Sequence, residues 1–489
     1  MTLPISLVGI FLLTRFINLT NIPIFTDEAI YLRWAQIALA DPRWRFISLI
    51  DGKQPLFIWI LLPVLKIITD PLIAGRIVSI FAGLTAALIL AILSLYKTKS
   101  YWGFITGFIF YLILPFFLVY DRLALYEALF LIFSISALCL SFILGRTLRF
   151  DVALLLGTVT GFGLLTKSYS NFFLLLYPLT LLLVNWKKGY KVKIFGKWLG
   201  LGLIVYMQSQ IYENILRLSE FRYIIGQKNL SFIYSLKEFF VNPLRSVTGN
   251  LHGMLGWLIG YLTLPLFIYL LVSLIWFFTK NRKEGLFFLG WFGIPFIALA
   301  FFGKVIYPRF LLFMTPPLLI PGVVYTLFLC ARFAERRIIV PIFLIISIPL
   351  IFFDYKLLTS PVTAPLPYAD RQQLINDWPA GYGIKEVVTY IDSESRNGPV
   401  ILATEGTFGL FPMAVELYLG KNVNVTVKAY WPLSDFPQEL LQLARTKKVF
   451  LVFKEKQNIP VNWPIQLIQE YRRGDGPTYL KFYRVIANT

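Results

Sequence analysis

Long apolar runs separated by short polar segments make up the chain as far as Phe353. The runs are rich in Leu, Ile and Phe, and they have the length that a membrane helix needs, about 20 residues. None has the alternating pattern of a membrane β-strand. The pattern predicts about eleven membrane helices. They lie at residues 4–19, 72–96, 101–119, 128–144, 151–166, 170–186, 196–212, 251–279, 286–302, 310–331 and 338–353.

The first run, residues 4–19, has the length of a signal peptide. No basic residue precedes it, however, and no small-residue cleavage site follows it. We therefore expect a retained first helix that contains Arg15. A further run at 55–68 is shorter and contains Pro63, which favours an interfacial or re-entrant helix over a membrane span.

Basic residues gather in the loops on one side of this topology. If residues 55–68 do not span and the amino terminus is cytoplasmic, each short basic cluster falls on the cytoplasmic side, as the positive-inside rule requires. These clusters are Lys97 and Lys99; Arg146 and Arg149; Lys187, Lys188, Lys191, Lys193 and Lys197; Lys280, Arg282 and Lys283; and Arg332, Arg336 and Arg337.

Acidic residues sort to the opposite side. Before residue 354, only Asp151, Glu284 and Glu335 face the cytoplasm in this topology. The outward-facing acids are Asp27, Glu28, Asp41, Asp51, Asp70, Asp121, Glu127, Glu213, Glu220 and Glu238. We therefore look for acid–base chemistry on the outer face.

The composition changes after Phe353. Residues 354–489 hold half of the chain's 26 acidic residues and no apolar run long enough to span. Strand-like runs at 399–403, 448–453 and 479–485, with helical patterns near 383–394 and 436–446, predict a small α/β domain. We expect a membrane domain at 1–353 and a soluble domain on the outer side at 354–489.

The amino-acid composition limits which side chains can carry out catalysis and which ligands the protein is suited to bind. The chain is 57% hydrophobic and only 15% charged, against about 25% charged in soluble domains. Its two cysteines lie inside apolar runs, and its single histidine, His252, cannot form a zinc cluster, so acid–base work falls to carboxylates. The net charge of +20 suits a protein that handles phosphates or anionic lipids, although basic loops beside membrane helices give part of it. No nucleotide-binding motif is present.

The stretch IFTDEAIY, residues 24–31, places two adjacent acids at the start of a predicted interfacial helix. Thr26 is a candidate cap, which would put Asp27 and Glu28 in the first turn, where the helix dipole favours anions. On this pattern alone, the two acids either support the helix start or carry out chemistry.

Several motifs that follow one another along the chain resemble those of a known family, and this resemblance favours a chemical role for the two acids. They are FTDEAIYLRWAQIALA (25–40), GKQPLFIWI (52–60), GRIVSIFAGLTAALIL (75–90), YDRLALYEALFLIF (120–133), GFGLLTKSYS (161–170), KVIYPRFLLFMTPPLLI (304–320) and DRQQLINDWPAGYGIKEVVTYI (370–391). This series resembles the C-type (GT-C) membrane glycosyltransferases that use polyprenyl-phosphate sugars, such as protein O-mannosyltransferases and aminoarabinose transferases. The match covers most of residues 1–353. Gln54 replaces a proline of the family pattern, Glu127 stands where Asp is usual, and Asp121 stands where Ser is common.

The resemblance implies a GT-C fold and a hexosyl- or pentosyltransferase in which Asp27 is the general base. Asp27 would take the proton of an acceptor hydroxyl as it attacks the anomeric carbon, and the lipid phosphate would leave without a second acid. We expect inversion and no covalent intermediate. Glu28 and Glu127 are further catalytic candidates; Glu127 could orient the acceptor, support Asp27, hold a cation, or only start its helix.

Cations at the outer interface are candidates for binding the donor phosphate, although each could be an ordinary interface residue. The substrate-binding candidates are Tyr31, Lys53, Gln54, Arg76, Asp121, Lys167, Lys304, Tyr307 and Arg309. Arg222, Lys228 and Arg245 are weaker candidates for substrate binding, and we interpret His252 as a structural residue. The metal requirement stays open, with an oxygen-only Mg²⁺ or Mn²⁺ site as one alternative.

The expected partners are a polyprenyl-phosphate-sugar donor, membrane lipid and an acceptor that is protein, lipid or polysaccharide; no nucleic acid is expected. We place the protein in the plasma (inner) membrane, with Asp27 and Glu127 on its outer face. Two alternatives compete with this reading. A transporter or lipid flippase would show charges deep in its helices and repeated halves, and a non-catalytic scaffold would leave these acids without a role.

Overall fold

The computed structural model describes residues 2–187, 190–333 and 339–487. Lys188, Glu335, Arg336 and Arg337, which the predicted topology uses, lie outside these residues. The chain divides into two compact units. The helical unit comprises Met1–Ile17, Arg45–Ile60 and Arg76–Leu358, and the α/β unit comprises Asn18–Trp44, Leu61–Gly75 and Thr359–Thr489. Two early segments thus join the tail in one unit, whereas the sequence predicts a single division after residue 353.

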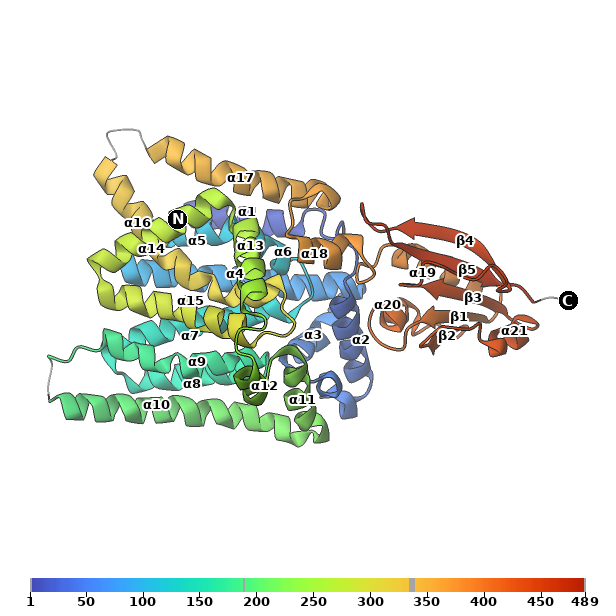
Figure 1. Ribbon diagram of the computed structural model, residues 1–489, viewed down its shortest axis with the longest axis horizontal. Helices are drawn as coiled ribbons and strands as arrows, with labels where there is room; N and C mark the ends of the chain where they lie inside the picture. The colour runs from blue at the N-terminus through green and yellow to red at the C-terminus, as the bar shows by residue number, and fades with distance from the viewer. Residues whose placement is uncertain (1, 188–189, 334–338, 488–489) are drawn as a thin grey trace. The chain divides into compact units, whose positions relative to one another are not determined.

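The helical unit is built from apolar helices joined by short connections (Figure 1). Its first half contains α1 (Thr2–Phe16), α5 (Tyr101–Leu112), α6 (Pro115–Asp121), α7 (Tyr126–Thr147), α8 (Phe150–Leu164), α9 (Asn171–Leu175) and the 3-10 helix η4 (Tyr177–Leu183). Its second half contains α10 (Lys191–Glu213), α11 (Tyr223–Phe232), α12 (Leu236–Val241), α13 (Val247–Leu262), α14 (Leu264–Lys280), α15 (Arg282–Phe302), η7 (Pro308–Met314), α16 (Pro316–Phe333) and α17 (Ile339–Thr359). Two helices, α3 (Leu56–Ile67) and α4 (Pro71–Thr98), contribute residues to both units.

Five described helices are long and apolar enough to cross a membrane, and up to seven spans result if each of two bent helix pairs counts as one. The predicted run 251–279 is one of these pairs: α13 and α14 meet at 103°. The bend lies at Thr263, whose backbone has φ +60°. The predicted span 170–186 is the short α9 followed by η4. As expected for residues 55–68, α3 has only 12 residues and rises about 18 Å, well short of a bilayer core of about 30 Å.

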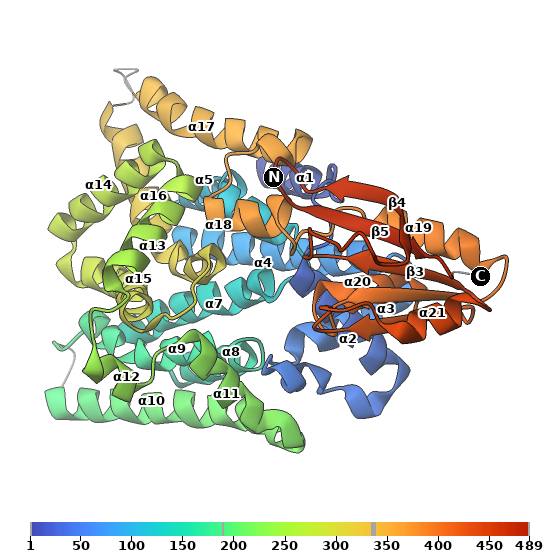
Figure 2. The same ribbon diagram turned by 45° about the vertical axis from the view of Figure 1, so that its right-hand side comes forward.

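Glycines allow two helices of the helical unit to approach closely. α8 and α10 run side by side in Figures 1 and 2. A Cβ at Gly161 of α8 would lie 2.6 Å from the ring of Tyr212 on α10, and one at Gly157 would lie 2.6 Å from Gln208. Since real contacts are not that short, these positions need glycine for the helices to pack.

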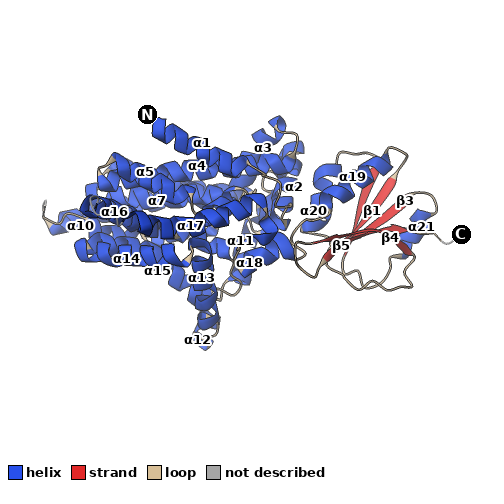
Figure 3. Cartoon of the chain, turned by 90° about the horizontal axis from the view of Figure 1, so that it is seen from above, coloured by secondary structure: helices blue, strands red, loops and turns tan. Residues whose placement is uncertain are grey.

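The α/β unit contains one five-stranded sheet in the order β2-β1-β3-β5-β4 (Figure 3). β1 pairs parallel with β2 and β3, whereas β5 pairs antiparallel with β3 and β4. The strands are β1 (Val400–Glu405), β2 (Val425–Tyr430), β3 (Lys448–Phe453), β4 (Ile465–Arg472) and β5 (Tyr479–Val485). The helices are α2 (Thr26–Ala40), α18 (Tyr368–Arg371), α19 (Ile384–Ser395), α20 (Leu410–Leu419) and α21 (Gln438–Ala444). The three predicted strands and two predicted helices of the tail are confirmed.

Helices pack on both faces of the sheet. Leu440 of α21 shares a buried cluster with Ile401, Val449 and Leu451. The alternate residues face α19, whose Tyr390 ring lies 5.6 Å from Phe450 and 5.3 Å from Phe482. This alternation with period two is what a doubly covered strand requires.

Candidate active site

The helix that carries Asp27 starts at Thr26, one residue earlier than a Thr26 cap would place it. Both the backbone N–H and the hydroxyl of Thr26 donate to the carbonyl of Pro379, each at 3.0 Å. The prediction that Thr26 caps α2 is therefore wrong, because a carbonyl from the tail takes its hydroxyl. Asp27 and Glu28 do lie in the first turn, as predicted.

The two acids of this turn have different surroundings. Glu28 is fully buried, and its carboxylate accepts the backbone N–H of Phe25 at 2.9 Å, as a capping glutamate does. Asp27 is only partly buried. Tyr31, four residues after Asp27 and hence on the same side of the helix, is buried against Trp34.

The tail holds this helix start by main-chain hydrogen bonds. Phe25 and Ala380 form an antiparallel bridge, and Gly381 N–H donates to the carbonyl of Ile24 at 2.9 Å. A Cβ at Gly381 would lie 2.5 Å from that carbonyl, so the close approach needs glycine. Asp27 is therefore placed by residues about 350 positions away in the chain.

The side of α2 packs on α20. Arg33 Nε lies 3.1 Å from Glu416 Oε2, and Gln36 Nε2 donates to the carbonyl of Leu417 at 2.9 Å. Ala29, Leu32 and Ala35 of the helix are fully buried. The predicted interfacial helix is thus an integral part of the α/β unit.

In the helical unit, Glu127 is the centre of a buried ion cluster. Its carboxylate is 5% exposed and lies in the first turn of α7. Lys167 Nζ, which follows α8, lies 2.5 Å from Glu127 Oε1, and Arg309 Nε, in η7, lies 3.8 Å from the same oxygen. Three predicted residues from distant segments therefore meet, with two cations on one acid.

Gln54 is bonded to two residues that are adjacent in sequence to members of this cluster: Ser168, next to Lys167, and Tyr126, next to Glu127. Its side-chain amide donates to Ser168 Oγ at 2.7 Å, and its backbone carbonyl accepts the hydroxyl of Tyr126 at 2.8 Å. Asn229 Nδ2 also donates to Ser168 Oγ, at 3.3 Å. Lys53 lies over the ring of Phe232, 5.5 Å from its centroid.

Sequence reasoning missed Ser168, Tyr169 and Asn229. The ring of Tyr169 lies beside Lys167 and packs on Phe310 and Phe313. The first two directly follow Lys167 in the motif TKSYS, whose polar residues interrupt an apolar run and could have been noticed. Asn229 has no such signal, because only the fold brings α11 to this site.

Lys304 and Tyr307 lie in the connection before η7. Lys304 Nζ forms a 2.8 Å ion pair with Glu238, and this contact, together with two hydrogen bonds from Ser235, lowers the pKa of Glu238 to about 2. The same connection is held by a bridge between Ile233 and Gly303. The guanidinium of Arg309 stacks over Tyr307, 4.9 Å from the ring centroid.

Asp121 belongs to a second buried network. Its carboxylate pairs with Arg15 at 3.3 Å and accepts the hydroxyl of Tyr111 at 3.1 Å. A Cβ at Gly83 would lie 2.2 Å from Asp121 Oδ1, so the glycine makes room for this acid. These are the contacts of a structural ion pair, and a substrate-binding role for Asp121 stays a prediction. The same holds for Arg76, which is fully buried in α4.

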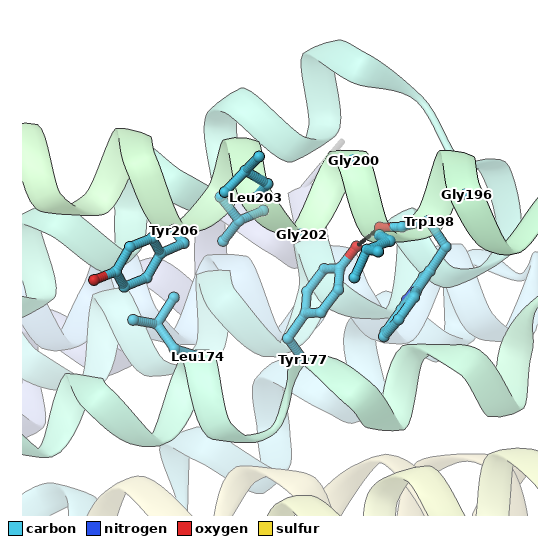
Figure 4. A pocket seen from close by; sticks show the side chains of 10 residues that line it. Leu174, Tyr177, Gly196, Trp198, Gly200, Gly202, Leu203 and Tyr206 are labelled. Atoms are coloured by element: carbon cyan, nitrogen blue, oxygen red, sulfur yellow. Dashed lines mark hydrogen bonds between the residues drawn. The ribbon is translucent and has the colours of Figure 1, made fainter.

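Two further features bear on ligands. Among the described residues, no group of three or more His, Cys, Asp or Glu side chains could hold a metal ion. A cavity of about 680 Å³ lies along α10, between it and the segment that carries Leu174 and Tyr177 (Figure 4). Glycine, aliphatic and aromatic residues line it, and none of the predicted site residues does. It offers no charged group for chemistry.

Comparison with known proteins identifies the fold. No protein-family model matches the chain, and no curated protein matches it. Among solved structures, apo ArnT from Cupriavidus metallidurans is 12% identical, with a TM-score of 0.59 over 99% of this chain and 98% of that one. The same protein bound to undecaprenyl phosphate gives 0.60 over the same shares.

An oligosaccharyltransferase from Archaeoglobus fulgidus, in complex with Zn and sulfate, gives a TM-score of 0.52 at 12% identity, over 92% of this chain and 68% of that one. The chain therefore has the GT-C fold with a small α/β domain, which confirms the predicted fold class. With its long apolar helices, it is a membrane protein.

Proposed function

We propose that this protein is a glycosyltransferase that moves a sugar from a polyprenyl-phosphate donor to an acceptor hydroxyl on the outer side of the membrane. The observation that carries the proposal is the fold shared over nearly the full length with ArnT, of which one structure contains undecaprenyl phosphate. The placement of basic loops on the opposite side supports the outward orientation.

Asp27 is the general base of the proposed reaction. Its carboxylate takes the proton of the acceptor hydroxyl while that oxygen forms a bond to the anomeric carbon. The bond from that carbon to the phosphate oxygen breaks at the same time, and the polyprenyl phosphate leaves with the electron pair. Because one displacement occurs, the anomeric configuration inverts. Glu28, which is buried and bonded to the N–H of Phe25, is a positioning residue that fixes the turn.

Lys167 and Arg309 bind the donor phosphate in this proposal. Both already share the carboxylate of Glu127, which holds them in place. Positive groups that are fixed before the reaction stabilise the charge that grows on the leaving phosphate without further reorganisation. Lys53 and Gln54, on the segment tied to Ser168, complete the polar surroundings. A Mg²⁺ or Mn²⁺ ion at Glu127 stays a prediction.

The substitution Asp27→Asn tests the base. It keeps the size and shape of the side chain but cannot accept the proton, so we expect sugar transfer to fall by about 10²- to 10⁴-fold. Products formed from a panel of polyprenyl-phosphate sugars would be measured by mass spectrometry, and folding by thermal unfolding in lipid nanodiscs.

Asp41→Asn is the matched control. Asp41 lies at the other end of α2, where its side chain pairs with the neighbouring Arg43 on the surface. This variant should keep the wild-type rate. Full transfer by Asp27→Asn would remove Asp27 from the base role, and flux of an unchanged lipid-linked sugar across sealed vesicles would favour a transporter instead.

A further inference from the structure

The carboxyl ends of β1, β2 and β3 meet at one edge of the sheet, because these strands are parallel. The chain leaves β1 toward α20, which lies beside α19, and it leaves β2 toward α21 on the opposite face. The strand order reverses between β1 and β3, because β1 is followed by β2 on one side and β3 is followed by β4 and β5 on the other. Open α/β sheets bind ligands outside the carboxyl ends of their strands at such a point. The residues at this edge of the sheet are therefore candidates for binding a ligand.

Lys454 directly follows β3 at this edge. Its side chain is 6% exposed, and its Nζ lies 4.4 Å from the ring centroid of Trp378 and 5.4 Å from that of Trp431. Burial lowers its pKa. Its backbone N–H donates to Glu405 at 2.8 Å, whereas its ammonium faces the two indole rings.

Arg473, just after β4, is a second buried cation. It is 0% exposed, and its Nε donates to the carbonyl of Ala380 at 3.2 Å. Both terminal nitrogens, Nη1 and Nη2, have no hydrogen-bond partner among the described residues. Burial lowers its pKa to about 10. A fully buried guanidinium with two unsatisfied nitrogens is costly unless a ligand completes it.

The nearby acids are already engaged. The carboxylate of Glu405, at the end of β1, accepts the backbone N–H groups of Lys454 and Glu455 at 2.8 Å and also that of Lys456. Asp377 Oδ1 accepts the N–H of Trp378 at 2.7 Å. These acids balance the charge, but their hydrogen bonds go to the backbone, and the two terminal nitrogens of Arg473 have no partner among the described residues.

Aromatic surface lies beside these cations. Trp431, the first residue after β2, is 56% exposed, and Trp378 is partly exposed. The face of an indole ring is electron-rich and attracts the positively polarised C–H groups of a sugar ring. A ligand with a sugar ring and an anionic substituent would use both the ring faces and the open N–H groups.

We propose that Trp378, Trp431, Lys454 and Arg473 form a binding site for an anionic saccharide, with the sugar ring on Trp431 and its phosphate or carboxylate on Lys454 and Arg473. This inference rests on the proposed function when it takes the saccharide to be the acceptor. Arg473 also holds Ala380, which bridges to Phe25, two residues before Asp27. The site and the proposed base therefore share one stretch of backbone.

Calorimetric titration of the full-length protein tests the site without any turnover. The protein would be held in nanodiscs of phosphatidylcholine, so that no anionic lipid competes, and titrated with glucose 6-phosphate, glucuronic acid, glucose and inorganic phosphate. We expect saturable binding of glucose 6-phosphate or glucuronic acid, at least about tenfold tighter than glucose. Comparison of the two charged sugars tells a phosphate site from a carboxylate site.

Lys454→Met keeps an unbranched side chain of similar length beside the two rings and removes the charge. It should weaken binding of the charged sugar about tenfold, which is typical for a hydrogen bond to a charged group. Lys456→Met is the matched control: Lys456 also lies over a tryptophan ring, Trp463, but its Nζ donates to the carbonyl of Leu433 at 2.9 Å. This variant should bind as the wild type does.

Three results would overturn the proposal: equal affinity for glucose and the charged sugars, equal affinity for inorganic phosphate and glucose 6-phosphate, or unchanged binding in Lys454→Met. The first two need only the wild-type protein, so a variant that fails to fold does not leave the question open. Asp27→Asn should bind the charged sugar normally, and so failure of the transferase proposal and failure of this site give different results.

Discussion

Two buried glutamates each pair with two cations. One of these clusters lies near the start of α7 and the other near its end. Glu127, in its first turn, binds Lys167 and Arg309. Glu284 of α15 binds Arg146, in the last turn of α7, and Lys97 Nζ at 2.6 Å. The chemistry of the two clusters is the same, and only the first is proposed to meet the donor. This pairing provides a test in which stability and function can be separated.

Lys167→Met and Lys97→Met each remove one cation from a buried glutamate. Because a second cation remains in each cluster, we expect both variants to lose about 1–3 kcal/mol of unfolding free energy. Only Lys167→Met should also weaken binding of undecaprenyl phosphate, by about tenfold, since it removes a charged hydrogen bond to phosphate. Thermal unfolding and lipid titration measure the two effects, and equal lipid affinity in both variants would contradict the phosphate role of Lys167.

At the scale of elements, the contact between α2 and α20 sets the direction of the helix that carries Asp27. The ion pair between Arg33 and Glu416 is part of this contact, together with the bond from Gln36 to the carbonyl of Leu417. Both charged side chains are about a quarter exposed, so the pair contributes less than about 1 kcal/mol to stability. Its proposed role is to hold the helix in position.

Arg33→Glu replaces this attraction by repulsion. We expect the transfer rate to fall by about tenfold, because a small displacement of a base is costly, while the protein stays folded. The charge-reversed double variant, Arg33→Glu with Glu416→Arg, restores the attraction and should restore most of the rate. Initial rates of sugar transfer measure both, and a double variant as slow as the single one would show that the pair does not position α2.

For the whole molecule, the most consequential feature is that the first loop and the tail belong to one compact unit. The start of α2 is bonded to Pro379 and Gly381, and Trp34 and Ile30 of the helix are buried. A chain that ends at Leu358 would lose the bonded partners of residues 24–26. We therefore expect the tail to be needed for placing Asp27, whatever else it binds.

Truncation after Leu358 should abolish sugar transfer and make residues 18–44 sensitive to protease. Limited proteolysis in nanodiscs, with cleavage sites found by mass spectrometry, would compare the truncated and the full-length protein. Cleavage at the connection between α14 and α15, beside Lys280 and Arg282, serves as the internal control and should be equal in both. If residues 18–44 were equally protected in both proteins, the tail would not be what holds α2.

Local features were predicted well. The run PVILA at 399–403 gave β1, and the acids of the TDE sequence lie in the first turn of α2 as expected. The two strands that were missed, β2 and β4, are the edges of the sheet and are only partly buried. A strand exposed on one edge can carry polar residues, so its hydrophobic signal is weak. The break at Thr263 was missed because the apolar run continues through it.

The sequence by itself determined that this is a membrane protein with a small α/β tail, and its motifs indicated the GT-C fold. Hydrophobic length and alternation are local quantities that need no knowledge of partners. Only the tertiary structure decided which polar groups meet: Glu127 with Lys167 and Arg15 with Asp121 as ion pairs, and the Thr26 hydroxyl with the Pro379 carbonyl as a hydrogen bond. These pairs lie 40, 106 and 353 residues apart, and contacts over such separations depend on how the whole chain folds.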